Sequence, residues 1–128
     1  MTFMTKVKKF EDVIAWQMVR ELVKMVYEMT RKGDFARDFS LKDQIRRAAV
    51  SIMSNIAEGF PRQTDKEFVQ FLYIAKGSIS EIQSQLYVAF DLGYVEVQEF
   101  NKAYELSSEV ARLLTGLIRY LQEGLASD

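Results

Sequence analysis

Two glutamates are the residues of this sequence best placed for acid–base chemistry. Glu58 follows Arg47 and Asn55 on one face of a helical segment, and Ser78 lies one turn before Glu81 in the next segment. Two carboxylates can act as general acid and general base. The same residue types also form hydrogen-bonded networks that fix the register of packed helices. We favour the structural network, because no pattern around these five residues marks a substrate pocket.

The composition excludes most enzymatic chemistry. The chain has no cysteine and no histidine, which excludes thiolate nucleophiles, disulfides, cysteine-ligated zinc, catalytic triads and HExxH metal sites. A metal held by carboxylates alone needs more of them to converge than this spacing offers. The sequence therefore predicts a protein that needs no cofactor and is not an enzyme.

The size and the apolar content indicate one ordered domain. The 128 residues are 48% apolar and 27% charged, with a single proline, as in an ordinary globular protein. The N-terminus has basic residues but lacks the apolar run of a signal peptide. No segment has the ~18 consecutive apolar residues that a membrane-spanning helix needs. We expect a cytoplasmic protein without membrane contact.

Helical periodicity and terminal signals divide the chain into four segments. Gly33 and Gly93 follow the first and third segments, as glycine does at helix ends. Pro61 ends the second segment, and Thr64 with Glu67 forms a capping box before the third. The sequence predicts an all-α fold, an antiparallel up-down four-helix bundle. Its helices are expected at about 10–32, 41–59, 65–92 and 96–123, in one domain of residues 10–124 between a basic arm at 1–9 and a polar tail at 125–128.

The first two predicted helices carry more apolar surface than one bundle interior can cover. Apolar residues on the first helix extend well beyond the ~100° of helix surface that usually faces a core. The second helix has an apolar strip beside its core face. We expect these surplus faces to form the interface of a homo-oligomer. The predicted interface residues are Trp16, Val19, Val23, Val50, Met53 and Ala57.

Positive charge is concentrated in the first half of the chain. Residues 1–63 hold 12 Lys and Arg against 8 Asp and Glu, whereas residues 64–128 hold 5 against 10. Attraction between the halves of one bundle explains this split, and so does a nucleic-acid surface. Arg46 and Arg47 point about 100° apart on a helix, and we expect Arg47 in the internal network and Arg46 outward. The candidate phosphate contacts are Lys6, Lys8, Lys9, Arg37, Lys42, Arg46, Arg62 and Lys66.

Several short segments together form a recognisable pattern: Gln44–Ala48, Ser51–Ile52, Ser54–Gly59, Glu67–Phe68, Phe71–Leu72 and Ala75–Ser78, together with Glu81. They resemble a known bacterial family, the four-helix-bundle proteins encoded in intervening sequences of large-subunit rRNA genes. That family is related to the accessory variability determinant of diversity-generating retroelements. The resemblance implies a bundle that assembles as a homopentamer. In the retroelement branch it also implies binding of nucleic acid and of a reverse transcriptase.

The sequence leaves two classes of function open. The leading hypothesis is a non-enzymatic homo-oligomeric bundle that binds RNA or DNA through its basic residues, as an accessory to rRNA or to a reverse transcriptase. The alternative is a protein–protein adaptor or scaffold without nucleic-acid contact. Phosphate binding weakens steeply with salt, so the salt dependence of binding separates the two hypotheses.

Overall fold

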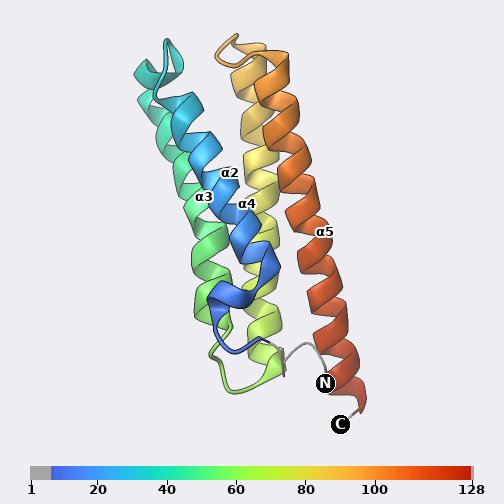
Figure 1. Ribbon diagram of the computed structural model, residues 1–128. Coiled ribbons are helices and arrows are strands. Elements are labelled where there is room, and N and C mark those ends of the chain that lie inside the picture. Colours follow the sequence, from blue (N-terminus) through green and yellow to red (C-terminus); the bar gives the residue numbers. More distant parts are fainter. Residues whose placement is uncertain (1–6, 128) are drawn as a thin grey trace.

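The structure, a computed structural model, describes residues 7–127, with side chains described up to residue 124. Within this range the chain forms four α-helices, two short 3-10 helices and no strand, which confirms the predicted all-α four-helix bundle (Figure 1). The α-helices are α2 (Ile14–Thr30), α3 (Phe39–Gly59), α4 (Asp65–Asp91) and α5 (Val97–Ser127). The 3-10 helices are η1 (Phe10–Asp12) and η2 (Phe35–Arg37).

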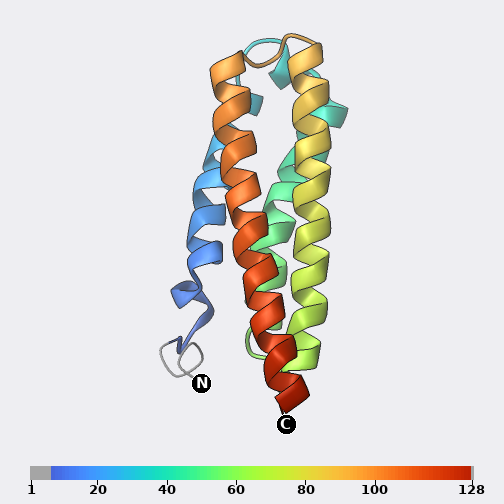
Figure 2. The ribbon, with the colours of Figure 1, turned by 90° about the vertical axis from the view of Figure 1, so that its right-hand side faces the viewer.

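The four helices run up and down in chain order around one core. α2 packs against α3 and α5, and α4 packs against the same two helices from the opposite corner (Figures 1 and 2). We call the end with the α2–α3 and α4–α5 connections the upper end, and the end with the α3–α4 connection the lower end. All four helices contribute fully buried side chains, including Leu22, Ile45, Ile52, Ile56, Leu72, Ile79, Ile82, Leu86, Leu114 and Leu121.

The first predicted helix is interrupted near its start. Val13 is extended, with φ −73° and ψ 117°, and separates η1 from α2. This break buries the Val13 side chain, which is 2% exposed. It also brings the ring of Phe10 edge-on to Trp16, with centroids 5.1 Å apart. The helix predicted from residue 10 therefore begins at Ile14, because side-chain burial outweighs helix continuity there.

The other helix ends differ from the prediction by a few residues, except at the end of α3 and the start of α4. Thr64 Oγ1 accepts a hydrogen bond from the Glu67 backbone N–H at 3.2 Å, which confirms the predicted cap. α3 starts at Phe39 because the Asp38 side chain caps it, accepting from the backbone N–H of Leu41 at 3.1 Å. α5 continues to Ser127 rather than ending at 123. Gly124 is not among the glycines with positive φ, so it does not end α5.

One carboxylate connects the two loops of the upper end. Besides capping α3, Asp38 accepts a hydrogen bond from the Tyr94 hydroxyl at 2.9 Å. This bond, followed by burial and the charges of Asp38 and Asp34, raises the pKa of Tyr94. The Tyr94 ring stacks on the fully buried ring of Phe35, with centroids 5.1 Å apart. The α2–α3 and α4–α5 connections are therefore held together at one point.

α3 and α4 approach each other closely at the lower end, at Gly59. A Cβ added there would lie 2.6 Å from the Phe71 Cβ and 2.9 Å from the Phe68 Cδ1. Gly59 is buried in the contact of α3 with α4, so both backbones are near the limit that side-chain volume allows.

Gly59→Ala is expected to destabilise the fold by about 1–3 kcal/mol, because the extra methyl group overpacks this contact. Urea unfolding followed by circular dichroism measures the change. Gly77→Ala is the matched control: Gly77 is exposed in the middle of α4, and a Cβ added there meets nothing within 4 Å. Alanine at that position should stabilise the helix by up to ~1 kcal/mol. An equal loss of stability in both variants would contradict the close approach at Gly59.

Candidate functional site

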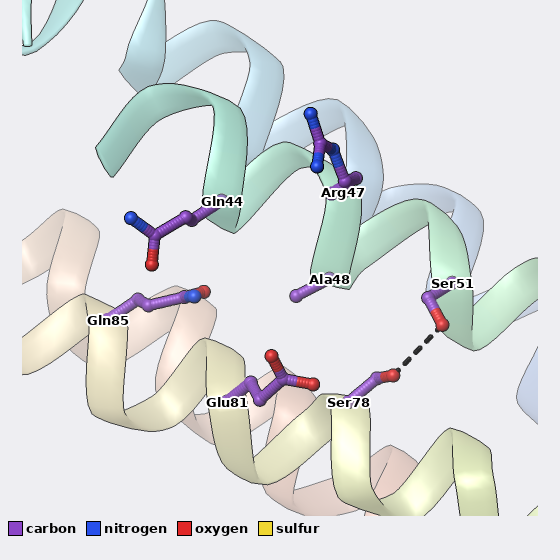
Figure 3. Close-up of a pocket in the computed structure, with 7 residues that line it drawn as sticks. All are labelled: Gln44, Arg47, Ala48, Ser51, Ser78, Glu81 and Gln85. Atoms are coloured by element: carbon purple, nitrogen blue, oxygen red, sulfur yellow. Dashed lines mark hydrogen bonds between the residues drawn. The ribbon is translucent and has the colours of Figure 1, made fainter. Parts of the chain in front are cut away.

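A polar groove of about 470 Å³ lies between α3 and α4, in the upper half of the bundle (Figure 3). At its base the Ser78 hydroxyl donates a hydrogen bond to the Ser51 hydroxyl at 3.0 Å. The Gln85 side-chain oxygen is buried and has no hydrogen-bond partner among the residues that the structure describes. The lining residues are Gln44, Arg47, Ala48, Ser51, Ser78, Glu81 and Gln85.

The predicted polar network exists in part, and Ser51 is at its centre. Asn55 donates through its side-chain amide to the backbone carbonyl of Ser51 at 2.8 Å and to the Ser51 hydroxyl at 3.1 Å. Ser78 and Asn55 are thus connected through Ser51, which was not among the residues predicted for the network. Arg47 and Glu81 line the groove, but both are exposed. In the described part of the chain their side chains form no hydrogen bond or ion pair.

Glu58 does not belong to this network, which corrects the prediction. Its side chain is exposed, and it lies ten residues beyond Ala48, roughly 15 Å along the helix. At that level α4 presents Phe68 and Phe71 to Gly59 of α3, and the Glu58 carboxylate forms no ion pair within the described residues. Glu58 and Glu81 therefore do not form an acid–base pair. Within residues 7–127, no three acidic side chains are arranged to hold a metal ion.

The roles predicted for the two neighbouring arginines are exchanged in the structure. Arg46 is half-buried and donates through Nε to the Thr30 hydroxyl at 2.8 Å. Its guanidinium carbon lies 4.3 Å from the centre of the Tyr27 ring. Arg47, predicted to be internal, is exposed. The physical reason is that Arg46 lies on the side of α3 that packs against α2, so its side chain links the two helices.

The predicted nucleic-acid contacts lie at two opposite ends of the bundle. α3 has 21 residues and is roughly 30 Å long, so cations at its two ends cannot share one small surface in a single copy. Lys6 lies outside the described residues. The lower end carries Lys8, Lys9, Arg62 and Lys66, all exposed, and the upper end carries Arg37, Lys42 and Arg46.

Each of the three upper cations is already bound within the chain. Arg37 forms an ion pair with Asp34 at 3.3 Å. Lys42 donates to the backbone carbonyl of Ala36 at 3.1 Å, and Arg46 holds α3 to α2 as described. The upper set is therefore mainly structural. None of the four lower cations takes part in an ion pair within the described residues, but Arg62 donates through Nε to the Glu58 backbone carbonyl at 3.1 Å and lies over the Phe71 ring.

Five of the six predicted interface residues remain accessible on the outer side of the α2–α3 contact. Val23 and Met53 line one shallow hollow there with Arg20 and Lys24, and Val50 lines a second one. We call Trp16, Val23, Val50, Met53 and Ala57 the α2–α3 strip; Val50 is exposed and the others are half-buried.

Val19 does not belong to the α2–α3 strip. It is fully buried, because it lies on the inward face of α2. Ala15, Leu22 and Val26 lie on the same face, and each of these residues is about one helical turn from the next. The apolar pattern of α2 is broad, and the sequence alone does not show how much of it is buried, so the prediction placed Val19 on the outer part.

Arg46→Met is expected to destabilise the fold by about 1–2 kcal/mol, because it removes the hydrogen bond to buried Thr30 and the contact with the Tyr27 ring. Arg47→Met should change the free energy of unfolding by less than about 0.5 kcal/mol, as an exposed substitution does. Urea unfolding of both variants measures the difference. Equal effects of the two substitutions would contradict the structural role of Arg46.

No helix in the described part of the chain is long and apolar enough to cross a membrane.

No curated protein matches the sequence. A solved structure, that of a protein with unknown function from the S23 ribosomal protein family of Bacteroides thetaiotaomicron VPI-5482, matches with a TM-score of 0.75 and 23% identity. The match covers 83% of this chain and 96% of that chain, and it supports a shared fold. The sequence model of the 23S rRNA-intervening sequence protein family matches residues 11–116. The chain therefore belongs to the 23S rRNA-intervening sequence protein family.

Proposed function

We propose that this protein is a non-enzymatic helical bundle that self-associates and binds RNA or DNA through the cations of its lower end. The observation that carries this proposal is a group of four exposed cations at that end: Lys8, Lys9, Arg62 and Lys66. None of them forms an ion pair in the described part of the chain. Cations without a carboxylate partner are available to phosphates.

The position of these cations on the backbone favours phosphate binding over sequence readout. Lys8 and Lys9 precede η1, and Arg62 and Lys66 flank the start of α4. They come from two separate segments at the end of the bundle rather than from a helix face that fits the major groove. Contacts of this kind attach to the phosphate backbone and carry little sequence information.

Self-association strengthens the proposal, because a ring of identical subunits repeats the same four cations in every copy. The α2–α3 strip supports such assembly: it is apolar, partly exposed and bordered by shallow hollows. A pentamer and a reverse transcriptase as partner rest on the family resemblance alone. The competing function is an adaptor that assembles through the same strip but does not contact nucleic acid.

Binding of a fluorescent single-stranded RNA should be tight at 50 mM salt and weak at 200 mM. Replacing Lys8, Lys9, Arg62 and Lys66 with glutamine is expected to weaken binding and to flatten the log–log salt slope by up to ~3, since each phosphate contact on a single strand contributes ~0.7. Arg37→Gln at the upper end is the control and should leave the slope unchanged. Absence of binding at 50 mM salt would refute the nucleic-acid role and leave the adaptor.

Light scattering after size-exclusion chromatography should give a multiple of the 14.9 kDa chain mass. Val50→Glu is expected to shift the protein toward the single-chain mass, because a charge in the α2–α3 strip cannot be buried against another copy without a large desolvation cost. Ile74→Glu is the matched control: Ile74 is 55% exposed on α4, away from the strip. A single-chain mass of the unmodified protein at micromolar concentration would disprove self-association.

A further inference from the structure

The polar groove between α3 and α4 holds two opposite charges that do not neutralise each other. Arg47 of α3 and Glu81 of α4 both line it, and both side chains are exposed. Within the described residues neither of them forms an ion pair or a hydrogen bond. Figure 3 shows the Arg47 guanidinium turned away from α4, whereas the Glu81 carboxylate points into the groove. Each charge is therefore available to a group from outside the chain.

A buried acceptor lies next to the Glu81 carboxylate. The Gln85 side-chain oxygen is buried without a hydrogen-bond partner, and no other buried side-chain nitrogen or oxygen in the described part of the chain lacks one. An unpaired buried acceptor is unfavourable unless a donor reaches it. Gln85 follows Glu81 by one helical turn, so both groups lie on the same face of α4. This wall of the groove therefore presents two neighbouring acceptors for N–H donors.

The groove suits a small polar molecule better than an apolar one. Ala48 is the one apolar residue among those that line it, and its volume of about 470 Å³ has room for a molecule the size of a free amino acid. At the base the hydroxyls of Ser51 and Ser78 are hydrogen-bonded to each other. These small side chains leave space above them and offer polar atoms to a ligand.

A free amino acid carries the complementary groups on a single carbon atom. Its ammonium group has three N–H donors, which is enough to serve the Glu81 carboxylate and the Gln85 oxygen together. Its carboxylate matches Arg47, since a guanidinium forms paired hydrogen bonds with carboxylates. Exposed side chains change rotamer within nanoseconds, so Arg47 can turn toward a ligand without disturbing the packed side of α3.

Ligands with a single charge are poorer matches for this groove. A phosphate would pair with Arg47 but would meet the Glu81 carboxylate in the same space. A simple amine would pair with Glu81 but would leave Arg47 without a partner and beside another cation. A metal ion would need further carboxylates, and within residues 7–127 no three acidic side chains are arranged to hold one. A molecule with both charges satisfies both walls.

We propose that the groove between α3 and α4 binds a free amino acid with a short polar side chain. The ammonium group donates to Glu81 and to the Gln85 oxygen, and the carboxylate pairs with Arg47. The side chain of the ligand lies against the hydroxyls of Ser51 and Ser78. The four cations of the lower end take no part in this site, so it adds a ligand to the proposed function and does not depend on RNA binding.

The test is ligand-detected saturation-transfer NMR on the full chain. The probes are L-serine, L-glutamine and two compounds matched to glutamine: γ-aminobutyramide, which lacks the carboxylate, and glutaramic acid, which lacks the ammonium group. L-Glutamine should bind with saturation in the millimolar range. Each matched compound should bind at least about tenfold more weakly, because it loses one charge-assisted contact.

Two substitutions separate the roles of the two charges. Glu81→Gln should weaken binding of L-glutamine about tenfold but should not weaken binding of glutaramic acid, which has no ammonium group. Arg47→Met should weaken binding of L-glutamine to a similar extent but should not weaken binding of γ-aminobutyramide, which has no carboxylate. Glu58→Gln is the matched control: it removes an exposed carboxylate of α3 that does not line the groove, and it should leave all affinities unchanged.

Circular dichroism checks that each variant is folded, and the two substituted groove side chains are exposed, so Arg47→Met and Glu81→Gln each test the site without the other. The proposal is overturned if neither L-serine nor L-glutamine binds at tens of millimolar, which is the expected result if Arg47 and Glu81 simply pair with each other across the groove. It is also overturned if L-glutamine and its two matched compounds bind equally, or if Glu58→Gln weakens binding as much as Glu81→Gln.

Discussion

The contact between α3 and α4 is the constraint on which the rest of the bundle depends. It is the most extensive helix contact in the fold, and its spacing is set by Gly59 at the lower end, where the backbone of α3 lies against Phe68 and Phe71. Further up, Ala48 and the hydroxyls of Ser51 and Ser78 occupy the same contact. Small residues along this line keep the two helices close, which leaves the larger side chains of both to fill the core shared with α2 and α5.

Periodicity and end signals were enough to predict the fold, because both are local properties of the chain. The Thr64 cap and the glycines Gly33 and Gly93 act on the helix ends next to them in the sequence. Both glycines have the positive φ expected at helix ends. Val13 shows where local signals are not enough. Its extended backbone buries its side chain against the core, and no local sequence pattern predicts the stabilisation that this burial provides. The same holds for Asp38, whose value as a cap depends in part on Tyr94, which is distant in sequence.

The candidate site was harder to predict, because a helical wheel gives the angle between side chains but not the identity of the neighbouring helix. Arg46 and Arg47 were correctly separated in direction and yet exchanged in role, since the wheel does not tell which of them faces α2. Glu58 shares a face with Ser51 and Asn55, but the partner helix offers aromatic rings at its level. Val19 was placed too far outward for a similar reason: how much of the apolar arc of α2 is covered depends on where α3 and α5 lie.

The two ends of the bundle have different surface chemistry, and the rigidity of α4 keeps them apart. Lys66 lies in the first turn of α4 and Tyr87 lies 21 residues later, which corresponds to roughly 30 Å along one unbroken helix. This exceeds the ~10 Å over which salt screens charges at ordinary ionic strength, so phosphates at the lower end do not disturb the charged groups of the upper end. A nucleic acid at the lower end would therefore leave the upper end of the same chain accessible. In an assembly of several copies the lower-end cations would be repeated in every copy, and the α2–α3 strip would fix the spacing between the repeats.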